Sequence, residues 1–290
     1  MLSMVGISML AALSFFAIRP YTLSLRTTFV PLGESSFELR KTVSSRGEMP
    51  FVFCAVHENE RTAAAATYEF LRQMGGTLFE VRAQGNRHVA FKLKKKTYLF
   101  DPNRIFTTMG IAATLRERGR YSDDALTAVN RFATRIVDSL VARKQVIVSM
   151  HNSTDGAFSV RSYLPDSTYA KCVRDIYING GRDEDEFFYV TQKSYFNALR
   201  AKGFNVVLQD NKTTEDDGSL SIYCGKRGIK YINIEAQHTH LAEQGEMLQA
   251  VYELLKKAAP PAIAARPAVT AIDTTKAKQT SVQKAAEEED

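Results

Sequence analysis

Residues 51–60 have the sequence Phe-Val-Phe-Cys-Ala-Val-His-Glu-Asn-Glu, and this segment is the most informative about the fold class. Its first six residues are continuously apolar, which is typical of a strand buried on both faces. A segment with apolar side chains at helical spacing follows at Arg61–Met74, and Gly75 and Gly76 end it. A buried strand followed at once by a helix is the repeating unit of an α/β fold.

The same alternation continues along the chain. Strands are predicted at Ser36–Thr42, Phe51–Val56, Thr77–Arg82, Val89–Leu93, Val146–Met150, Asn205–Leu208 and Tyr231–Ile234. Helices are predicted at Arg61–Met74, Asp124–Leu140, Thr191–Lys202, Leu220–Gly225 and Leu241–Lys257. Because buried strands that alternate with helices form layered sheets, we expect a three-layer α/β/α sandwich with a mixed central sheet, spanning about residues 30–257.

Two of these helices have an apolar face that predicts which side chains they bury. In the helix at 124–140 the face consists of Val129, Phe132, Ile136 and Leu140. In the helix at 61–74 it consists of Ala64, Ala65, Tyr68, Leu71 and Met74. Both faces should pack on the central sheet.

The composition is that of an ordinary globular protein with a substantial core. Of the 290 residues, 44% are hydrophobic and 24% are charged, and the formal net charge is +6. The densest basic run lies at 92–96 and has no interleaved aromatic residues, so it predicts a solvated turn and no nucleic-acid surface. No Cys-x-x-Cys pair occurs, which argues against a thiolate zinc site. Whether Cys172 and Cys224 pair is left open.

The two ends of the chain differ from the middle. Residues 1–18 carry no charge and are mostly apolar, which is typical of a signal peptide or a short membrane anchor. The basic residues that usually precede such a run are missing, so a misassigned start and a buried segment are the alternatives. A periplasmic or secreted location is expected, with a cytoplasmic one as the alternative. Residues 258–290 lose apolar periodicity, and a disordered tail is expected there.

Three predicted strands end in residues that can bind a metal ion or move a proton. His57 and Glu60 follow the first, His151 ends the second and Glu235 ends the third. Functional side chains gather at the carboxyl ends of strands in such sheets, so we expect these residues to meet. Two imidazoles and one carboxylate suit Zn²⁺ with an open position for water. The pattern predicts a zinc hydrolase in which His57, Glu60 and His151 bind the metal and Glu235 is the general base.

Five motifs in this order resemble the zinc carboxypeptidase superfamily, including its succinylglutamate desuccinylase and aspartoacylase branch. His-x-x-Glu at His57 and Glu60, the distant His151 and the late Glu235 match its ligands and general base. The resemblance covers most of residues 50–255. The chain departs from the family pattern directly after His57, where Glu58 replaces a residue that is usually small and often glycine; a second carboxylate here could alter metal preference or face solvent.

The resemblance also implies how substrate is held. Asp-Pro-Asn-Arg at 101–104 matches the Asn-Arg pair that binds the substrate carboxylate in the family, here Asn103 and Arg104. Arg87 stands where an upstream arginine of the family polarises the scissile carbonyl. The chemistry is suitable, because a guanidinium matches a carboxylate with two hydrogen bonds and a fixed cation stabilises a developing oxyanion.

Plainer interpretations exist for several of these residues. Glu235 could form a salt bridge at a strand end, and Asn103 with Arg104 could form an Asx turn after the proline. His238 and His240 follow Glu235 two residues apart; they could bind metal, but a polar loop leading into the last helix is the simpler interpretation.

The expected activity is zinc-dependent cleavage of an amide bond next to a carboxylate-bearing group. A metallocarboxypeptidase-type peptidase acting on peptides or cell-wall peptides fits this description. The alternatives are an N-acyl amino acid deacylase of the same superfamily and a non-catalytic binding protein that retains the fold. No nucleic-acid partner is expected, and a membrane tether through the N-terminal segment is an option.

Overall fold

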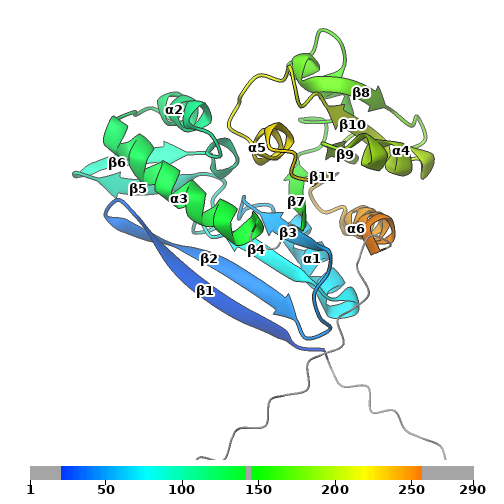
Figure 1. The fold of residues 1–290 in the computed structure, drawn as a ribbon, viewed down its shortest axis with the longest axis horizontal. Coiled ribbons are helices and arrows are strands. Elements are labelled where there is room, and N and C mark those ends of the chain that lie inside the picture. Colours follow the sequence, from blue (N-terminus) through cyan, green and yellow to red (C-terminus); the bar gives the residue numbers. More distant parts are fainter. Residues whose placement is uncertain (1–20, 142–144, 257–290) are drawn as a thin grey trace, which may run out of the picture. The chain divides into compact units, whose positions relative to one another are not determined.

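The structure is a computed structural model of the chain and describes residues 21–141 and 145–256 (Figure 1). Its central sheet includes three neighbouring parallel strands, whose carboxyl ends lie at the same end of the sheet. The strands are β1 Leu23–Leu32, β2 Ser35–Ser44, β3 Phe51–Ala55, β4 Thr77–Val81, β5 Val89–Leu93, β6 Lys96–Phe100, β7 Val146–Ser153, β8 Val173–Tyr177, β9 Phe187–Val190, β10 Asn205–Gln209 and β11 Tyr231–Gln237. The α-helices are α1 Arg61–Met74, α2 Thr108–Glu117, α3 Asp123–Val141, α4 Lys193–Ala201, α5 Leu220–Lys226 and α6 Leu241–Leu255. Short 3₁₀ helices are η1 Pro102–Arg104, η2 Val160–Tyr163 and η3 Ala170–Cys172.

Nine strands form a mixed sheet in the order β1-β2-β4-β3-β7-β11-β9-β10-β8, and β5 pairs separately with β6. The central strands β4, β3, β7 and β11 run parallel to one another. Antiparallel pairing of β2 with β4 and of β9 with β11 makes the sheet mixed. The predicted α/β class with a mixed central sheet is confirmed.

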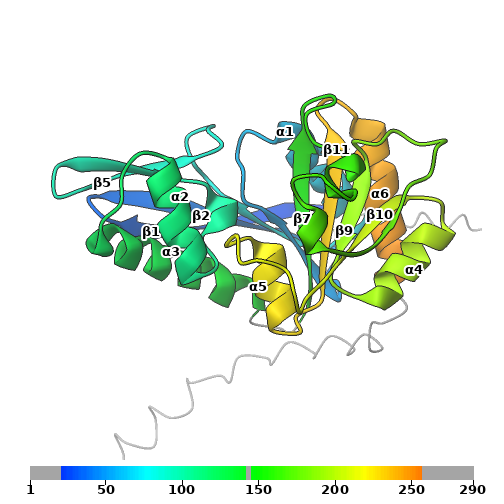
Figure 2. The same cartoon turned by 90° about the horizontal axis from the view of Figure 1, so that it is seen from above.

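Helices cover both faces of this sheet, so the central strands are buried on both sides. One core cluster includes side chains of α1, α4 and α6, and another includes side chains of α2, α3 and α5. Figure 2 shows α3 beside β1 and β2, while α6 lies beside β11. The alternate residues of β7 and β11 therefore point toward different layers, which matters for the site below.

The apolar face predicted for α3 is confirmed: Val129, Phe132, Ile136 and Leu140 are all buried. The face predicted for α1 is wrong by about one position. Its buried residues are Ala63, Ala66, Thr67, Phe70 and Leu71, whereas Ala65 is exposed. Residues 63–66 of this helix are all alanine, so the sequence gives little contrast between its faces, and packing on β3, β7 and α6 selects the side that is buried.

The predictions for both ends of the chain, at 1–18 and 258–290, lie outside the described residues. The described elements belong to one compact unit. Within 21–141 and 145–256, none of the helices is both long enough and apolar enough to cross a membrane. Cys172 and Cys224 are not paired with each other, and Cys54 is a free, buried core residue.

Candidate metal centre and active site

The parallel pairing of β7 with β11 places two polar rows side by side. Asn233 is opposite Ser149, and Glu235 is opposite His151. Because side chains alternate along a strand, these residues share one face, while Met150 and Ile234 pack into the core on the other face. Neighbouring strands lie about 4.8 Å apart, so the register alone brings Glu235 next to His151.

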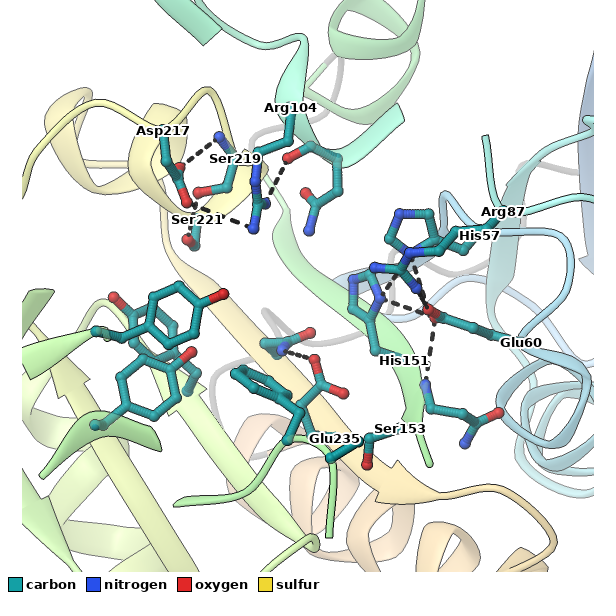
Figure 3. Close-up of a pocket in the computed structure, with 18 of the residues that line it drawn as sticks. His57, Glu60, Arg87, Arg104, His151, Ser153, Asp217, Ser219, Ser221 and Glu235 are labelled. Carbon is teal, nitrogen blue, oxygen red and sulfur yellow. Dashed lines mark hydrogen bonds and ion pairs between the residues drawn. The ribbon is translucent and has the colours of Figure 1, made fainter. Parts of the chain in front are cut away.

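His57, Glu60 and His151 converge on one point beside this row (Figure 3). The Nδ1 atom of His57 lies 2.9 Å from Oε1 of Glu60, and Nδ1 of His151 lies 2.9 Å from Oε2 of the same carboxylate. The two Nδ1 atoms are 3.3 Å apart. All three side chains are buried.

The backbone explains why the three-residue spacing works. His57 follows β3 by two residues, and Glu60 is the residue that precedes α1. Glu60 makes no side-chain bond to cap the helix. Its carboxylate turns instead toward the two histidines and accepts a hydrogen bond from the backbone N–H of Asn152 at 3.3 Å. The turn between strand and helix therefore directs an imidazole and a carboxylate to the same point.

The outer nitrogen of each imidazole also has a partner. Nε2 of His57 lies 2.7 Å from Oδ1 of Asp101, and Nε2 of His151 lies 2.9 Å from the hydroxyl of Ser149. A carboxylate only accepts, so the Asp101 contact places a proton on Nε2 of His57. Such contacts orient each ring and direct its Nδ1 toward the point shared with Glu60, where a metal ion would bind.

Asp101 has a role that was not predicted from the sequence, although it begins the run at 101–104. The signal was present: Asp101 directly follows β6, just as His57 closely follows β3. It is buried, and its second oxygen lies 3.7 Å from Nε of Arg87.

Charges around the centre are strongly coupled. Burial disfavours a charge on His57, but the carboxylates of Glu60 and Asp101 outweigh it and raise the pKa of His57 to about 9. Burial alone would raise the pKa of Glu60, yet the two imidazoles hold it well below its usual value. The site therefore favours positive charge between two carboxylates, which is the environment that suits a bound cation.

The donor set also fits zinc in size. Zinc lies about 2.0–2.1 Å from its nitrogen and oxygen ligands. When these ligands are arranged in a tetrahedron, their ligand atoms are about 3.3 Å apart. The three separations here are 2.9, 2.9 and 3.3 Å. Two neutral imidazoles with one carboxylate are a set found in catalytic zinc sites, which keep a fourth position open.

Arg87 contacts one of these ligands, whereas Glu58 does not. Nη1 of Arg87 is 2.6 Å from Oε1 of Glu60, and its side chain remains 44% exposed. Glu58 pairs with Arg82 and with the backbone N–H of Ala83. The carboxylate that departs from the family pattern is therefore occupied outside the metal centre.

Glu235 is buried beside the ligands. Its Oε1 accepts a hydrogen bond of 3.0 Å from the side-chain amide of Asn233. Burial raises the pKa of Glu235 above its usual value, and the negative charge of Glu60 adds to this effect. A carboxyl group whose pKa is raised holds a proton more readily, which suits a group that accepts a proton and later donates it.

A single pocket of about 470 Å³ collects all seven residues predicted from the sequence: His57, Glu60, Arg87, Asn103, Arg104, His151 and Glu235. Figure 3 shows the three ligands on one side of it and Arg104 with Asp217 on another. Another wall consists of phenol rings tilted against one another, with Tyr163 centred 5.4 Å from Tyr169 and 5.1 Å from Tyr189. The sequence did not predict this wall, whose residues come from two segments and carry no motif.

Arg104 and Asn103 are held in η1 at the pocket wall. Nη1 of Arg104 donates to the backbone oxygen of Asn103 at 3.0 Å, and Nη2 lies 3.7 Å from Asp217. The side-chain oxygen of Asn103 accepts the backbone N–H of Leu220 at 3.2 Å. These contacts leave part of the guanidinium facing the pocket.

The two histidines that follow Glu235, His238 and His240, lie in different places. His238 lines the pocket. His240 lies outside it, with Nδ1 2.6 Å from Glu186. His240, Glu186 and the exposed Asp183 could also hold an ion, but they form a separate group at the surface.

No protein-family model and no curated protein matches the chain. Solved structures do. An aspartoacylase family protein from Mesorhizobium loti is 13% identical at a TM-score of 0.45, over 81% of this chain and 67% of that one. The ectoine utilization protein EutE from Ruegeria pomeroyi is 14% identical at a TM-score of 0.44, over 82% of this chain and 71% of that one. Thrombin activatable fibrinolysis inhibitor is 12% identical at a TM-score of 0.44, over 80% of this chain and 71% of that one.

The similar structures include members of the aspartoacylase and succinylglutamate desuccinylase family, the branch that the sequence motifs resemble. The chain spans about two thirds of the length of the aspartoacylase family protein and of a succinylglutamate desuccinylase/aspartoacylase from Rhodobacter sphaeroides, at 67% and 66%. At such low identity the likeness does not identify a substrate, and the function must be derived from the site itself.

Replacing Asp101 with asparagine should weaken metal binding by about 10- to 100-fold, because the amide no longer fixes the tautomer and basicity of His57. Competition of a zinc-chelating dye with the purified variant measures this affinity. Asp138→Asn removes an aspartate of α3 far from these ligands and should leave the affinity unchanged. An unaltered affinity in Asp101→Asn would show that the His57 contact is incidental.

Proposed function

We propose that the protein is a zinc-dependent hydrolase that cleaves an amide bond next to a carboxylate-bearing group, as a metallocarboxypeptidase-type peptidase. One observation carries this proposal: two imidazole nitrogens and a carboxylate converge beside a second buried carboxylate, within one pocket that also holds an arginine. A structural ion pair would need neither the second carboxylate nor the pocket.

His57, Glu60 and His151 would hold the ion. Zinc, when bound, supplies Lewis acidity and lowers the pKa of a coordinated water toward about 7. Glu235 removes a proton from the attacking water, whose oxygen forms the new bond to the carbonyl carbon. The carbon–nitrogen bond then breaks, and Glu235 returns the proton to the leaving nitrogen, giving a carboxylate and an amine.

The two arginines of the pocket have different proposed roles because they lie in different parts of it. Arg87 reaches the ligand side of the pocket, where a cation stabilises the negative charge that develops on the carbonyl oxygen. Arg104 faces the pocket from η1 with Asn103, away from the ligands, where a guanidinium can bind the free carboxylate of a chain end.

Replacing Arg104 with alanine should raise KM by about 10- to 100-fold on substrates with a free carboxylate, since a charge-assisted pair contributes about 1.5–3 kcal/mol. The KM for substrates with an amidated end should rise much less. Comparing kcat/KM for both kinds of substrate measures the effect. Equal losses on both would show that Arg104 does not bind the carboxylate.

A panel of peptides and N-acyl amino acids, assayed with and without chelator, tests the proposal as a whole. The proposal predicts chelator-sensitive release of a carboxyl-terminal residue from peptides. Turnover of N-acyl amino acids alone would identify a deacylase instead. Zinc-loaded protein that hydrolyses neither class would support the non-catalytic alternative.

The place of action follows from the first residues of the chain. We infer that the uncharged run at 1–18 directs export, so that the substrate is an extracytoplasmic peptide such as a cell-wall peptide. Fractionation of cells that express the full chain tests this, and recovery in the cytoplasm alone would contradict it.

A further inference from the structure

Glu58 lies between two of the proposed metal ligands in the turn after β3, but the mechanism above does not use it. Its side chain is only 9% exposed. Both of its carboxylate oxygens contact the segment 82–88, which connects β4 to β5: Oε1 pairs with the guanidinium of Arg82, and Oε2 accepts the backbone N–H of Ala83. The turn that supplies two metal ligands is therefore tied to the segment that carries Arg87.

The sheet explains why this contact can form. β3 and β4 are parallel neighbours, with Ala55 opposite Glu80. Their carboxyl ends therefore lie at the same end of the sheet, and the segments that leave them begin side by side. Because β3 ends at Ala55 and β4 at Val81, Glu58 and Ala83 each lie only a few residues beyond a strand end.

The segment 82–88 makes a tight turn directly before Arg87. The backbone N–H of Asn86 donates to the carbonyl oxygen of Ala83 at 3.1 Å, and the side-chain amide of Asn86 donates to the same oxygen at 3.2 Å. Gln84 and Gly85, the two central residues of the turn, have φ angles of 56° and 79°. A positive φ is unfavourable for Gln84, so this conformation depends on the contacts around it. Ala83 anchors the turn, because its carbonyl closes the turn and its N–H binds Glu58.

Arg87 follows this turn, and its side chain points back toward the metal ligands (Figure 3). Its Nη1 lies 2.6 Å from Oε1 of Glu60, while the side chain remains 44% exposed. A long and partly exposed cation has many rotamers, so a fixed backbone next to it restricts where its charge lies. Glu58 and Glu60 thus hold the segment 82–88 from the same turn, one through its backbone and one through Arg87.

We propose that Glu58 is a positioning residue: by accepting the N–H of Ala83 it fixes the turn that places the Arg87 cation where negative charge develops. This inference rests on the proposed function, in which Arg87 stabilises the carbonyl oxygen. A cation that is already in place contributes more than a mobile one, because nothing has to reorganise when the charge forms. The plainer alternative is that Glu58 only stabilises the fold.

Replacing Glu58 with alanine should lower kcat about tenfold on the panel substrate that the wild-type protein cleaves most rapidly. KM should change by less than about threefold, because Arg87 acts on the transition state. Arg87→Ala removes the cation and should lower kcat by about 10²-fold. The double variant should be no slower than Arg87→Ala alone, since Glu58 then has no cation to position.

Two further variants test the contact with Ala83. Glu58→Gln keeps an oxygen that can accept the Ala83 N–H but loses the charge that pairs with Arg82, so its kcat should be within about threefold of the wild-type value. If Glu58→Ala does not fold, Glu58→Met preserves the length of the side chain without an oxygen acceptor and takes its place in the double-variant comparison.

Glu34→Ala is the matched control. Oε1 of Glu34 accepts the backbone N–H of Lys95 at 3.0 Å, which is the same kind of contact, and neither residue lines the pocket. This variant should keep its turnover in the wild-type background and should not change that of Arg87→Ala. Melting curves and zinc content of every variant show that folded, loaded proteins are being compared.

The outcomes are distinguishable. A loss of kcat in Glu58→Ala that disappears when Arg87 is already replaced, with the control unchanged, supports the inference. Four results would overturn it while the proposed function stands: losses that multiply in the double variant, an unchanged kcat in Glu58→Ala, an equal loss in Glu58→Gln, or loss of zinc from Glu58→Ala. A zinc-loaded wild-type protein that cleaves no member of the panel would overturn the proposed function and this inference with it.

Discussion

Replacing Glu235 with glutamine should reduce kcat by about 10³-fold and leave zinc bound. The amide keeps the shape of the side chain and its place beside Asn233 but cannot take a proton from water. Because Glu235 acts in proton transfer and not in substrate binding, kcat should fall while KM changes little. Steady-state kinetics on the most rapidly cleaved peptide measures the effect.

Glu246→Gln provides a comparison at a carboxylate of the same charge on α6, where Glu246 pairs with Arg182 at the surface. That variant should retain zinc and turnover. A Glu235→Gln protein that works at nearly the wild-type rate would remove Glu235 from the mechanism and return it to the plainer interpretation of a strand-end carboxylate.

Replacing His151 with alanine should abolish both zinc retention and hydrolysis. One of the two nitrogen ligands disappears, and Glu60 loses the partner that lies 2.9 Å from its Oε2. Since the metal supplies several kcal/mol of stabilisation to the transition state, turnover should fall by at least about 10³-fold. Elemental analysis and kinetics of the same preparation check both parts.

His238→Ala is the control, because His238 lines the same pocket but is not one of the three ligands. It should keep its zinc. Retention of a full complement of zinc by His151→Ala would show that the ion sits elsewhere, and the group at Asp183, Glu186 and His240 would then need to be tested.

The sequence predicted most of the site because its residues follow strands. His57 and Glu60 come after a continuously apolar run, and His151 and Glu235 lie near the ends of two more. Parallel strands bring their carboxyl ends to one edge, so residues that are 94 positions apart in the chain become neighbours, as His57 and His151 do. Strand length was underestimated: β7 continues to Ser153 and β11 to Gln237, because polar residues in these segments face the pocket.

Other parts were not predictable by the same reasoning. The strands β6, β8 and β9 and the helix α2 were missed. One or two strands were expected before residue 50, but no bounds were predicted for β1, because most of its side chains are exposed and it has no buried apolar run. Its place in the sheet comes from pairing with β2 along its whole length. The hydrogen bond from Asn233 to Glu235 joins two side chains of one strand, and neither composition nor spacing identifies it.

The central claim is that His57, Glu60 and His151 jointly bind one zinc ion. The most direct measurement is the zinc content per chain of protein purified after growth with added zinc, determined by mass spectrometry of the metal. We expect about one zinc per chain, and close to none when His57 is replaced with alanine. Near-zero zinc in the wild-type protein, or equal zinc in both, would contradict it.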